Sequence, residues 1–285
     1  MTSPKALLTT REVAELLRVK ERKVYDLAAS NEIPHRRVTG KLLFPEDELM
    51  AWINGGTAGT TARPPIIAGS HDPLLDWAAR EAGADLATLF DGSAAGLAKF
   101  AARDAVMSGL HIPDADGWNI TAVAAAGLRD CVLIGMAYRT QGLMMRPDVA
   151  DLVISLDDLS GRRVLLRQPG AGARSLFDRL AQGVDLSSAQ IADAPARTET
   201  DAAQEVAQGN ADISFGLEAA AHQYGLSFAP LVQEQFDLLI DRTAYFHPSV
   251  QALLHFLASP ACADKARLLK GYDLSPLGTV RWVSP

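Results

Sequence analysis

The sequence predicts an α/β protein in two parts, a small N-terminal domain with a helix-turn-helix pattern and a larger C-terminal α/β domain. Two short amphipathic helix patterns joined by a tight turn predict the first part. After residue 65, apolar strand patterns alternate with helical ones, which predicts a second part with a mostly parallel sheet. A stretch rich in Gly, Thr, Ala and Pro separates the two. We therefore divide the chain into residues 1–54, a linker at 55–64, and residues 65–285.

The composition is compatible with this division. The 285 residues suffice for two domains, and 48% of them are hydrophobic and 21% charged, as in an ordinary soluble protein. No apolar run reaches the roughly 18 residues of a membrane-spanning helix, and charges interrupt the N-terminus where a signal peptide needs an apolar core. Cys131 and Cys262 lack metal-ligand spacing. We expect a cytoplasmic protein with free thiols, no bound metal and no membrane contact.

The charge is unevenly distributed along the chain. The formal net charge is −7, yet residues 1–54 hold nine Lys and Arg against eight Asp and Glu, a net charge of +1. The rest of the chain therefore carries −8, the difference between −7 and +1. The two parts are expected to face different partners. The clustering of the basic residues indicates these partners better than the net charge of +1 does.

The N-terminal helices begin with a capping box. Thr9 is the expected N-cap, and Glu12 stands three residues later. An apolar stripe at helical spacing follows. Residues 18–20 then form a short turn before a second helix over residues 21–30. The basic N-terminal end of that second helix is the part that meets base edges and phosphates in such motifs.

A hairpin and a third helix follow. Two extended stretches flank Thr39-Gly40, which predicts a small wing. Pro45 is expected in the first turn of a third helix that ends near Trp52. The same pattern also fits a three-helix interaction module whose Lys and Arg form a solvated face.

Residues 7–54 resemble the excisionase-type (MerR-like) winged helix-turn-helix DNA-binding domain. The resemblance rests on "LTTREVAELLRV", "VYDLAASNEIP", the wing and "PEDELMAWI", in this order. It implies that the second helix and the wing contact double-stranded DNA, with phosphate contacts that give salt-dependent affinity. The residues expected to contact DNA are Lys20, Arg22, Lys23, Tyr25, Arg36, Arg37 and Lys41.

The C-terminal domain is predicted from strand–helix pairs. "PIIAGS" is an apolar strand, and the helix after it has Asp72 as its cap, Pro73 at its first position and Gly83 at its end. "ADLATLFDGS", "VLLRQPGAGA" and "ADISFGL" are further strand-like runs that each lead into a helical stretch. In such sheets, ligands gather at the carboxyl ends of the strands, where helix N-termini point.

Three strand ends lead into helix starts through small or hydroxyl residues, at Ser70, at Ser93 and at the loop 170–172. Unpaired N–H groups and the helix macrodipole make each start a weak anion site, and converging starts can enclose an anion without a metal. Arginines at 139, 167 and 174 could add charge-assisted hydrogen bonds.

The loop 170–172 does not match a nucleotide-binding loop. Ala173-Arg174 follows its last glycine, where a P-loop needs Lys followed by Ser or Thr. Ser175 stands where a Rossmann loop needs its third glycine. The sequence shows no recognisable nucleophile–base pair or metal cluster. We therefore expect a binding protein and not an enzyme.

Most of residues 65–245 resemble the type II periplasmic-binding-protein-like domain associated with molybdate and tungstate regulators and with molybdopterin biosynthesis proteins. The resemblance rests on "GSHDPLLD", "DGSAAGL", "SGLHI", "IGMAYRTQGLMM", "LLRQPGAGARSLFD" and "EQFDLLID", in this order. It implies a two-lobed clamshell with an oxyanion in its cleft. Lobe one would span about residues 65–140 plus the C-terminal tail, and lobe two about residues 143–232. The residues expected at the ligand are Ser70, His71, Ser93, His111, Arg139, Arg167, Gly170, Gly172 and Arg174.

One departure from the family pattern concerns the loop. Ala171 and Ala173 stand where the family usually has hydroxyl residues that can donate to an oxyanion. The backbone N–H groups remain, but two donors are lost. A small carboxylate therefore stays open as the ligand beside molybdate and tungstate.

The two resemblances together imply a ligand-responsive one-component transcriptional regulator. It would bind a DNA operator and a small anionic effector such as molybdate or tungstate, as a homodimer or higher homo-oligomer, with no cofactor besides the bound oxyanion. Three alternatives stay open. They are the same architecture with a small carboxylate or another anion, an enzyme of molybdenum cofactor metabolism, and a constitutive DNA-architectural protein with an empty clamshell.

Overall fold

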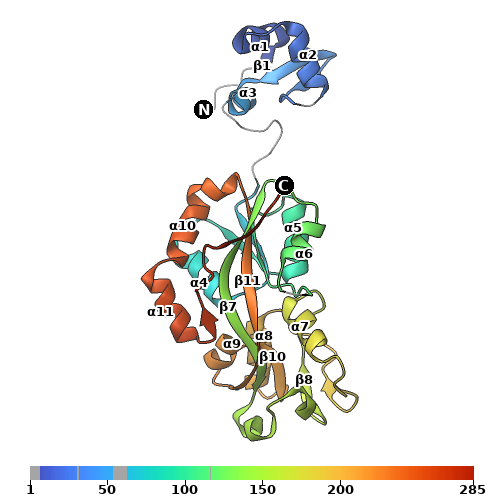
Figure 1. The fold of residues 1–285 in the computed structure, drawn as a ribbon, viewed down its shortest axis with the longest axis vertical. Coiled ribbons are helices and arrows are strands. Elements are labelled where there is room, and N and C mark those ends of the chain that lie inside the picture. The colour runs from blue at the N-terminus through green and yellow to red at the C-terminus, as the bar shows by residue number, and fades with distance from the viewer. Residues whose placement is uncertain (1–6, 31, 54–62, 116) are drawn as a thin grey trace. The chain divides into compact units, whose positions relative to one another are not determined.

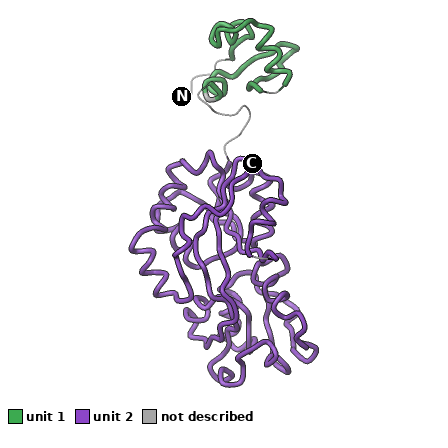
Figure 2. The backbone as a smooth tube through the Cα atoms, viewed as in Figure 1, with its two compact units in different colours: residues 1–62 green, residues 63–285 purple. Residues whose placement is uncertain are grey.

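The structure is a computed structural model that describes residues 7–30, 32–53, 63–115 and 117–285. The chain divides into two compact units, residues 1–62 and residues 63–285 (Figure 2). The linker predicted at residues 55–64 lies outside the described residues except for Arg63 and Pro64. Each unit has a hydrophobic core of its own.

The first unit contains a helix-turn-helix and a wing, as the sequence predicts. In chain order its described elements are β1 Leu7–Thr9, α1 Thr10–Leu17, α2 Glu21–Ala29, β2 Arg36–Val38, β3 Lys41–Pro45 and α3 Glu46–Ile53 (Figure 1). The Thr9 hydroxyl accepts from the Glu12 N–H, and the Glu12 carboxylate accepts from the Thr9 N–H at 2.7 Å, which confirms the capping box. Val24 and Phe44 lie fully buried between the helices and the hairpin.

Two details of this unit differ from the prediction. The sequence reasoning missed β1, which pairs antiparallel with β3 so that the hairpin becomes a three-stranded sheet in the order β1-β3-β2. Pro45 is the last residue of β3, paired with Leu7, and α3 begins one residue later. A proline is tolerated at such a strand end because the strand needs no further N–H there.

The second unit is a two-lobed α/β fold whose lobes share two long strands. The shared strands are β7 Cys131–Met145 and β11 Ser227–Asp241, which pair antiparallel along their length. The first lobe adds β4 Ile66–Gly69, α4 Pro73–Glu81, β5 Ala87–Leu89, α5 Ser93–Ala101, β6 Met107–Leu110, α6 Ile120–Ala125, η3 Ala244–Phe246, α10 Pro248–Leu257, α11 Pro260–Leu269, β12 Tyr272–Asp273 and β13 Val280–Val283. The second lobe adds η1 Pro147–Leu152, η2 Leu156–Leu159, β8 Arg163–Leu165, α7 Gly172–Leu180, β9 Gln190–Ile191, α8 Glu199–Ala207, β10 Ile213–Leu217 and α9 Glu218–Gln223.

The sheet of the second unit is mixed, which corrects the predicted mostly parallel sheet. Its main path runs β5-β4-β6-β11-β7-β10-β8-β9, and β12 and β13 pair with β7. The pairs β4/β5, β4/β6, β8/β10 and β8/β9 are parallel, whereas every described pair of β7 or β11 is antiparallel. The prediction assumed that every strand leads into a helix, but β7 and β11 are 15-residue strands that pass from one lobe into the other.

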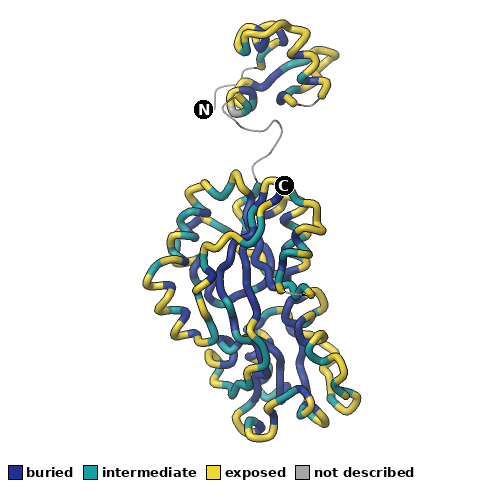
Figure 3. Tube along the Cα trace, viewed as in Figure 1, coloured by how far each residue is buried: buried dark blue, intermediate teal, exposed yellow. Residues whose placement is uncertain are grey.

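Helices cover both faces of each lobe. In the first lobe, α4, α10 and α11 lie on one side of the strands and α5 and α6 on the other, while in the second lobe α8 and α9 lie opposite α7 (Figure 1). The buried residues follow the central strands through both lobes (Figure 3). Cys131 and Cys262 are buried and unpaired, as expected. Within the described ranges, no helix combines the length and the apolar character needed to cross a membrane.

Candidate functional site

The basic residues predicted to contact DNA lie on the surface of the first unit. Lys20 is the N-cap of α2, and the side chains that follow it on α2, those of Arg22, Lys23 and Tyr25, are exposed. The apolar residues of α2 face the core instead, so the helix presents a polar, basic side to solvent. A basic helix side of this kind suits the phosphate backbone of DNA.

The wing carries the other three predicted residues. Arg36, Arg37 and Lys41 are all exposed on the hairpin of β2 and β3. Arg36 is tied to α3, because its guanidinium donates to Glu48 at 2.7 Å. Arg37 and Lys41 make no side-chain ion pair with any described residue of the chain, which leaves their charges available to a partner.

The predicted ligand residues of the second unit come from the ends of strands in both lobes. Ser70 and His71 follow β4, and His111 follows β6. The first lobe also supplies Ser93 at the start of α5. In the second lobe, Arg167 follows β8, and Gly170 and Gly172 lead into α7. Arg139 lies on the shared strand β7, level with Glu234 of β11.

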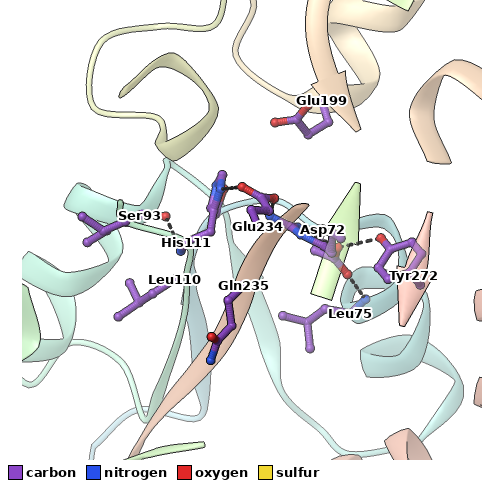
Figure 4. Close-up of polar contacts among 12 residues, drawn as sticks. Asp72, Leu75, Ser93, Leu110, His111, Glu199, Glu234, Gln235 and Tyr272 are labelled. Carbon is purple, nitrogen blue, oxygen red and sulfur yellow. Dashed lines mark hydrogen bonds and ion pairs between the residues drawn. The ribbon is translucent and has the colours of Figure 1, made fainter. Parts of the chain in front are cut away.

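The first-lobe residues form one hydrogen-bonded chain around His111. The Ser70 hydroxyl lies 2.7 Å from His111 Nε2, and His111 Nδ1 lies 2.6 Å from the Glu234 carboxylate. The His111 N–H donates to the Ser93 hydroxyl oxygen at 3.1 Å (Figure 4). Ser93 is the first residue of α5, and Gly92 is the N-cap. The Ser93 side chain thus accepts a hydrogen bond from the end of the neighbouring strand and does not cap its own helix.

Arg139 lies at the centre of a buried ion-pair network. Its guanidinium donates to Asp72 at 2.8 Å and to Glu234, and it stacks over the Phe236 ring. Tyr272 donates its hydroxyl to Asp72 at 2.6 Å (Figure 4). Burial alone would raise the pKa of Glu234, but the positive charges of Arg139 and His111 lower it to about 2. The two carboxylates thus each take one hydrogen bond from a terminal nitrogen of Arg139.

Arg167 forms the corresponding pair in the second lobe. Its guanidinium donates to Glu199 at the start of α8 and, at 2.8 Å, to the Arg197 carbonyl oxygen. Glu199 and Arg167 are 1% and 2% exposed, so this pair lies fully inside the protein. Figure 4 draws Glu199 on the second-lobe side, apart from the group around His111 and Glu234.

Several polar atoms in this region are buried without a partner. They include Nδ1 of His71, Nε of Arg139, Nε of Arg167 and Oε2 of Glu199. Burial lowers the pKa of His71, against the opposing effect of Asp72 and Glu199, so the imidazole is biased towards its neutral form. Buried polar atoms normally have partners, so unpaired atoms of both lobes mark a place where a bound molecule would be accommodated.

A groove opens beside His71. It has a volume of about 450 Å³, and its walls include His71 and Trp77 of the first lobe and Thr200 and His222 of the second. Thr200 directly follows Glu199 in α8. The groove therefore reaches His71, whose Nδ1 is one of the unpaired atoms.

The lobes contact each other through the glycine loop. The Ala94 N–H donates to the Gly170 carbonyl oxygen at 3.5 Å, and the Gln168 side-chain amide donates to the Asp91 carbonyl oxygen at 3.2 Å. A Cβ on Gly172 would lie 2.6 Å from the His111 ring. The loop and the strand ends of the first lobe thus meet in close contact.

Arg174 lies at the edge of this group, where its guanidinium donates to the Arg167 carbonyl oxygen at 3.5 Å. Its guanidinium pairs with Asp178 one turn along α7 at 2.9 Å, and its side chain is partly exposed. The structure therefore brings the other predicted residues together at the lobe boundary and leaves Arg174 on the helix surface.

The sequence reasoning missed the carboxylates of the site. Asp72 was identified only as a helix cap, a role that it has, since its Oδ1 accepts from the Leu75 N–H at 2.6 Å. Glu199 stands next to Thr198, whose capping box with Asp201 looks like that of a surface helix. Glu234 lies in a long strand with no motif around it. Only the fold places these acids beside the arginines.

Comparisons with known proteins agree with this architecture. Residues 7–57 match the helix-turn-helix domain model, and residues 76–258 match that of the PBP superfamily domain. The uncharacterized protein YvgK of Bacillus subtilis (strain 168) is 24% identical over 300 residues, which cover 95% of this chain and 96% of that protein.

Solved structures resemble the fold at low sequence identity. A protein of Clostridium perfringens, assigned as a phosphate ABC transporter substrate-binding protein and solved with bound phosphate, has a TM-score of 0.52 and 15% identity. That match covers 72% of this chain and 96% of the other. A C206 mutant of OxyR from Corynebacterium glutamicum has a TM-score of 0.51 and 12% identity, with 92% and 89% of the two chains covered. Because the PBP model spans more than half of the chain, the protein belongs to the PBP superfamily and carries an excisionase-like helix-turn-helix domain in front of its two-lobed domain.

Proposed function

We propose that the protein is a ligand-responsive transcriptional regulator. The observation that carries the proposal is the presence, in one chain, of a helix-turn-helix unit with exposed basic residues and a two-lobed unit with unpaired buried polar atoms at its lobe boundary. The first unit binds double-stranded DNA through α2 and the wing. The second unit binds a small effector between its lobes and closes around it. Closure changes how the DNA-binding units of a homo-oligomer are presented.

The effector is a small anion. The converging helix starts of α5 and α7, with the hydroxyls of Ser70 and Ser93, favour an oxyanion of the molybdate or tungstate kind. The phosphate held by the Clostridium perfringens protein adds phosphate to the candidates. A small carboxylate is the alternative, because Ala171 and Ala173 withhold the side-chain donors that a tetrahedral oxyanion would use.

The experiment that tests this function measures coupling between the two ligands. The full chain is first used to select its operator from a random DNA library, and operator affinity is then measured by fluorescence anisotropy with and without each candidate anion. One anion should change the DNA affinity by about 5- to 150-fold, and the operator should change the affinity for that anion by the same factor. Equal DNA affinities with every anion that binds would contradict a sensor and favour the constitutive architectural protein.

A second candidate function rests on one observation of the site. The Ser70–His111–Glu234 chain has the distances of a nucleophile, a base and an orienting acid. The regulator is favoured because the same Glu234 is also held by Arg139 and because a DNA-binding unit precedes the site. Covalent labelling of Ser70 by a fluorophosphonate probe, lost in Ser70→Ala, would favour a hydrolase.

A further inference from the structure

We infer that Arg63 is a positioning residue that fixes the end of the linker to the first lobe, so that effector binding is transmitted to the DNA-binding unit. This inference rests on the proposed sensing function and adds the residue through which the second unit holds the linker. Arg63 and Pro64 are the described residues of the predicted linker, and both belong to the second unit.

The Arg63 side chain is buried in the first lobe. Its Nε donates to the Asp241 carboxylate at 2.8 Å. Its Nη1 donates to the carbonyl oxygens of Phe100 and Ala105, the latter at 3.1 Å. The guanidinium carbon lies 4.1 Å from the centre of the Phe100 ring, and the side chain is only 5% exposed. Separate segments of the first lobe thus hold one side chain at the end of the linker.

This burial is more than a flexible tether requires. Taking a guanidinium out of water costs free energy unless it is paired and hydrogen-bonded. Burial accordingly lowers the pKa of Arg63, and the hydrogen bond and charge of Asp241 act against that shift. An exposed side chain at this position would connect the two units equally well. The buried pair therefore indicates that this end of the linker is held in place.

Asp241 joins Arg63 to the two long strands. Its Oδ2 accepts from Arg63, while its Oδ1 accepts from the N–H groups of Thr243 at 3.1 Å and Ala244 at 3.0 Å. Asp241 is the last residue of β11, and it pairs with Cys131, the first residue of β7. We call the pair of Arg63 and Asp241 the linker anchor.

The elements that hold Arg63 also reach the boundary between the lobes. β11 ends at Asp241, α5 has Phe100 in its last turn, and β6 begins shortly after Ala105. Towards the lobe boundary, the same elements carry or lead to Glu234, Ser93 and His111, which are joined by hydrogen bonds through His111. Because helices and strands move as rigid units, the linker anchor moves together with the first-lobe half of the site.

Two prolines continue this fixed point into the sheet. Pro64 and Pro65 follow Arg63, and the restricted φ of proline makes this stretch stiff. The Pro65 carbonyl oxygen accepts from the Ala87 N–H at 2.9 Å, and β4 begins at Ile66. The chain is therefore held from Arg63 onwards. A movement of the first lobe reaches Arg63 without a flexible joint in between, whereas loss of the anchor would create such a joint.

The test replaces both members of the linker anchor in the full chain, by Arg63→Met with Asp241→Asn. Changing both partners leaves no buried charge unpaired, and the amide oxygen at position 241 can still accept from Thr243 and Ala244. Operator affinity is measured by fluorescence anisotropy with and without whichever of molybdate, tungstate, phosphate and acetate changes it most in the unmodified protein.

The double variant should separate coupling from binding. The factor by which the anion changes operator affinity should fall to at most about a third of its value in the unmodified protein. Affinity for the anion itself, measured by isothermal titration calorimetry, should stay within about twofold, because no anchor residue lies at the lobe boundary. A purely structural role of the pair would not change the first quantity while preserving the second.

Arg163→Met with Asp212→Asn is the matched control. This pair also joins a guanidinium to a carboxylate, at 2.7 Å, but it ties β8 to the residue before β10 in the second lobe. The control should keep the full effect of the anion on operator affinity. If the anchor double variant does not fold, Arg63→Lys decides in its place. Lysine keeps the charge but lacks the planar fork of arginine, so the factor should fall at least about twofold.

The outcomes separate this inference from the function on which it rests. An undiminished effect of the anion on operator affinity in the anchor variant overturns the inference and leaves the sensor standing. Loss of anion binding in the anchor variant also overturns it, because the pair would then serve the fold of the site. If no anion changes operator affinity in the unmodified protein, the proposed function is contradicted and the inference falls with it.

Discussion

Asp72 illustrates how one side chain joins secondary structure to the lobe boundary. One of its oxygens caps α4, and the other accepts hydrogen bonds from Arg139 and from Tyr272. The negative charge of Asp72 and, more strongly, burial raise the pKa of Tyr272 well above its ordinary value, so the hydroxyl stays a donor. A short capping residue thereby ties α4, β7 and β12 together.

Glu234 gives a prediction at the same scale. Its pKa is about 2 in the folded protein against an ordinary value of 4.5, so its ionised form stabilises the fold above pH 4.5. That stabilisation is lost as the pH falls from about 4.5 to about 2. Glu234→Gln should therefore lower the unfolding free energy at neutral pH by on the order of 3 kcal/mol and flatten its decline in acid.

Urea unfolding followed by circular dichroism at pH 7, 5, 4 and 3 measures this effect. Asp178→Asn, on the surface of α7, is the control and should leave the difference between pH 7 and pH 3 nearly unchanged. Parallel pH curves for Glu234→Gln and the unmodified protein would contradict the assignment of the low pKa to Glu234.

At the scale of elements, α2 and the wing form the surface through which we propose that the first unit binds DNA. The capping box fixes where α1 begins, and the antiparallel strands β2 and β3 hold the wing against the core residue Phe44. Neither element needs its basic side chains for folding, because these side chains are exposed. The charges on α2 and the wing can therefore be removed with little effect on stability.

Arg22→Ala combined with Arg37→Ala should weaken operator binding and reduce its salt dependence. Loss of two phosphate contacts lowers the slope of log K against log salt concentration by about 2. Fluorescence anisotropy across a salt series measures both quantities. Arg80→Ala, an exposed arginine of α4 in the second unit, is the matched control and should leave the slope unchanged. Unchanged operator affinity in the double variant would refute this DNA-binding surface.

At the scale of the whole molecule, the proposed function depends on closure of the second unit. Its lobes are joined by β7 and β11, and they touch through the loop 168–172 and the strand ends of the first lobe. Arg179 of α7 adds a contact to the first lobe, at 2.7 Å from the Asp114 carbonyl oxygen. Two lobes that share long strands can move as rigid bodies while these contacts form and break.

Gly172→Val tests whether closure is needed for binding. Its side chain would enter the space of the His111 ring, where a Cβ alone comes within 2.6 Å, so the lobes could not approach fully. Affinity for the effector should fall at least about tenfold while each lobe keeps its fold. Calorimetry gives the affinity, and small-angle X-ray scattering should show no compaction on adding ligand.

Gly117→Ala serves as the control for this variant, because a Cβ at Gly117 meets nothing within 4 Å. It should bind and compact like the unmodified protein. Full affinity in Gly172→Val would mean that the ligand binds without the contact between the loop and His111.

The sequence by itself determined the features that depend on neighbouring residues. Capping boxes, the wing turn at Thr39-Gly40, the cap of α4 by Asp72 and the strand ends at Ser70 and Arg167 are set by side chains within a few positions of each other. The order of motifs also revealed both domain families, which the comparisons support.

Only the tertiary structure decided how the site is composed. Glu234 reaches His111 across 123 positions of sequence, and Arg139 reaches Asp72 across 67. Pairing of β11 with β6 and with β7 brings Glu234 to His111 and to Arg139, and the sequence reasoning did not anticipate two such long antiparallel strands. A buried arginine requires a counter-charge, but its sequence position does not say which acid will supply it, because that depends on which strands lie side by side.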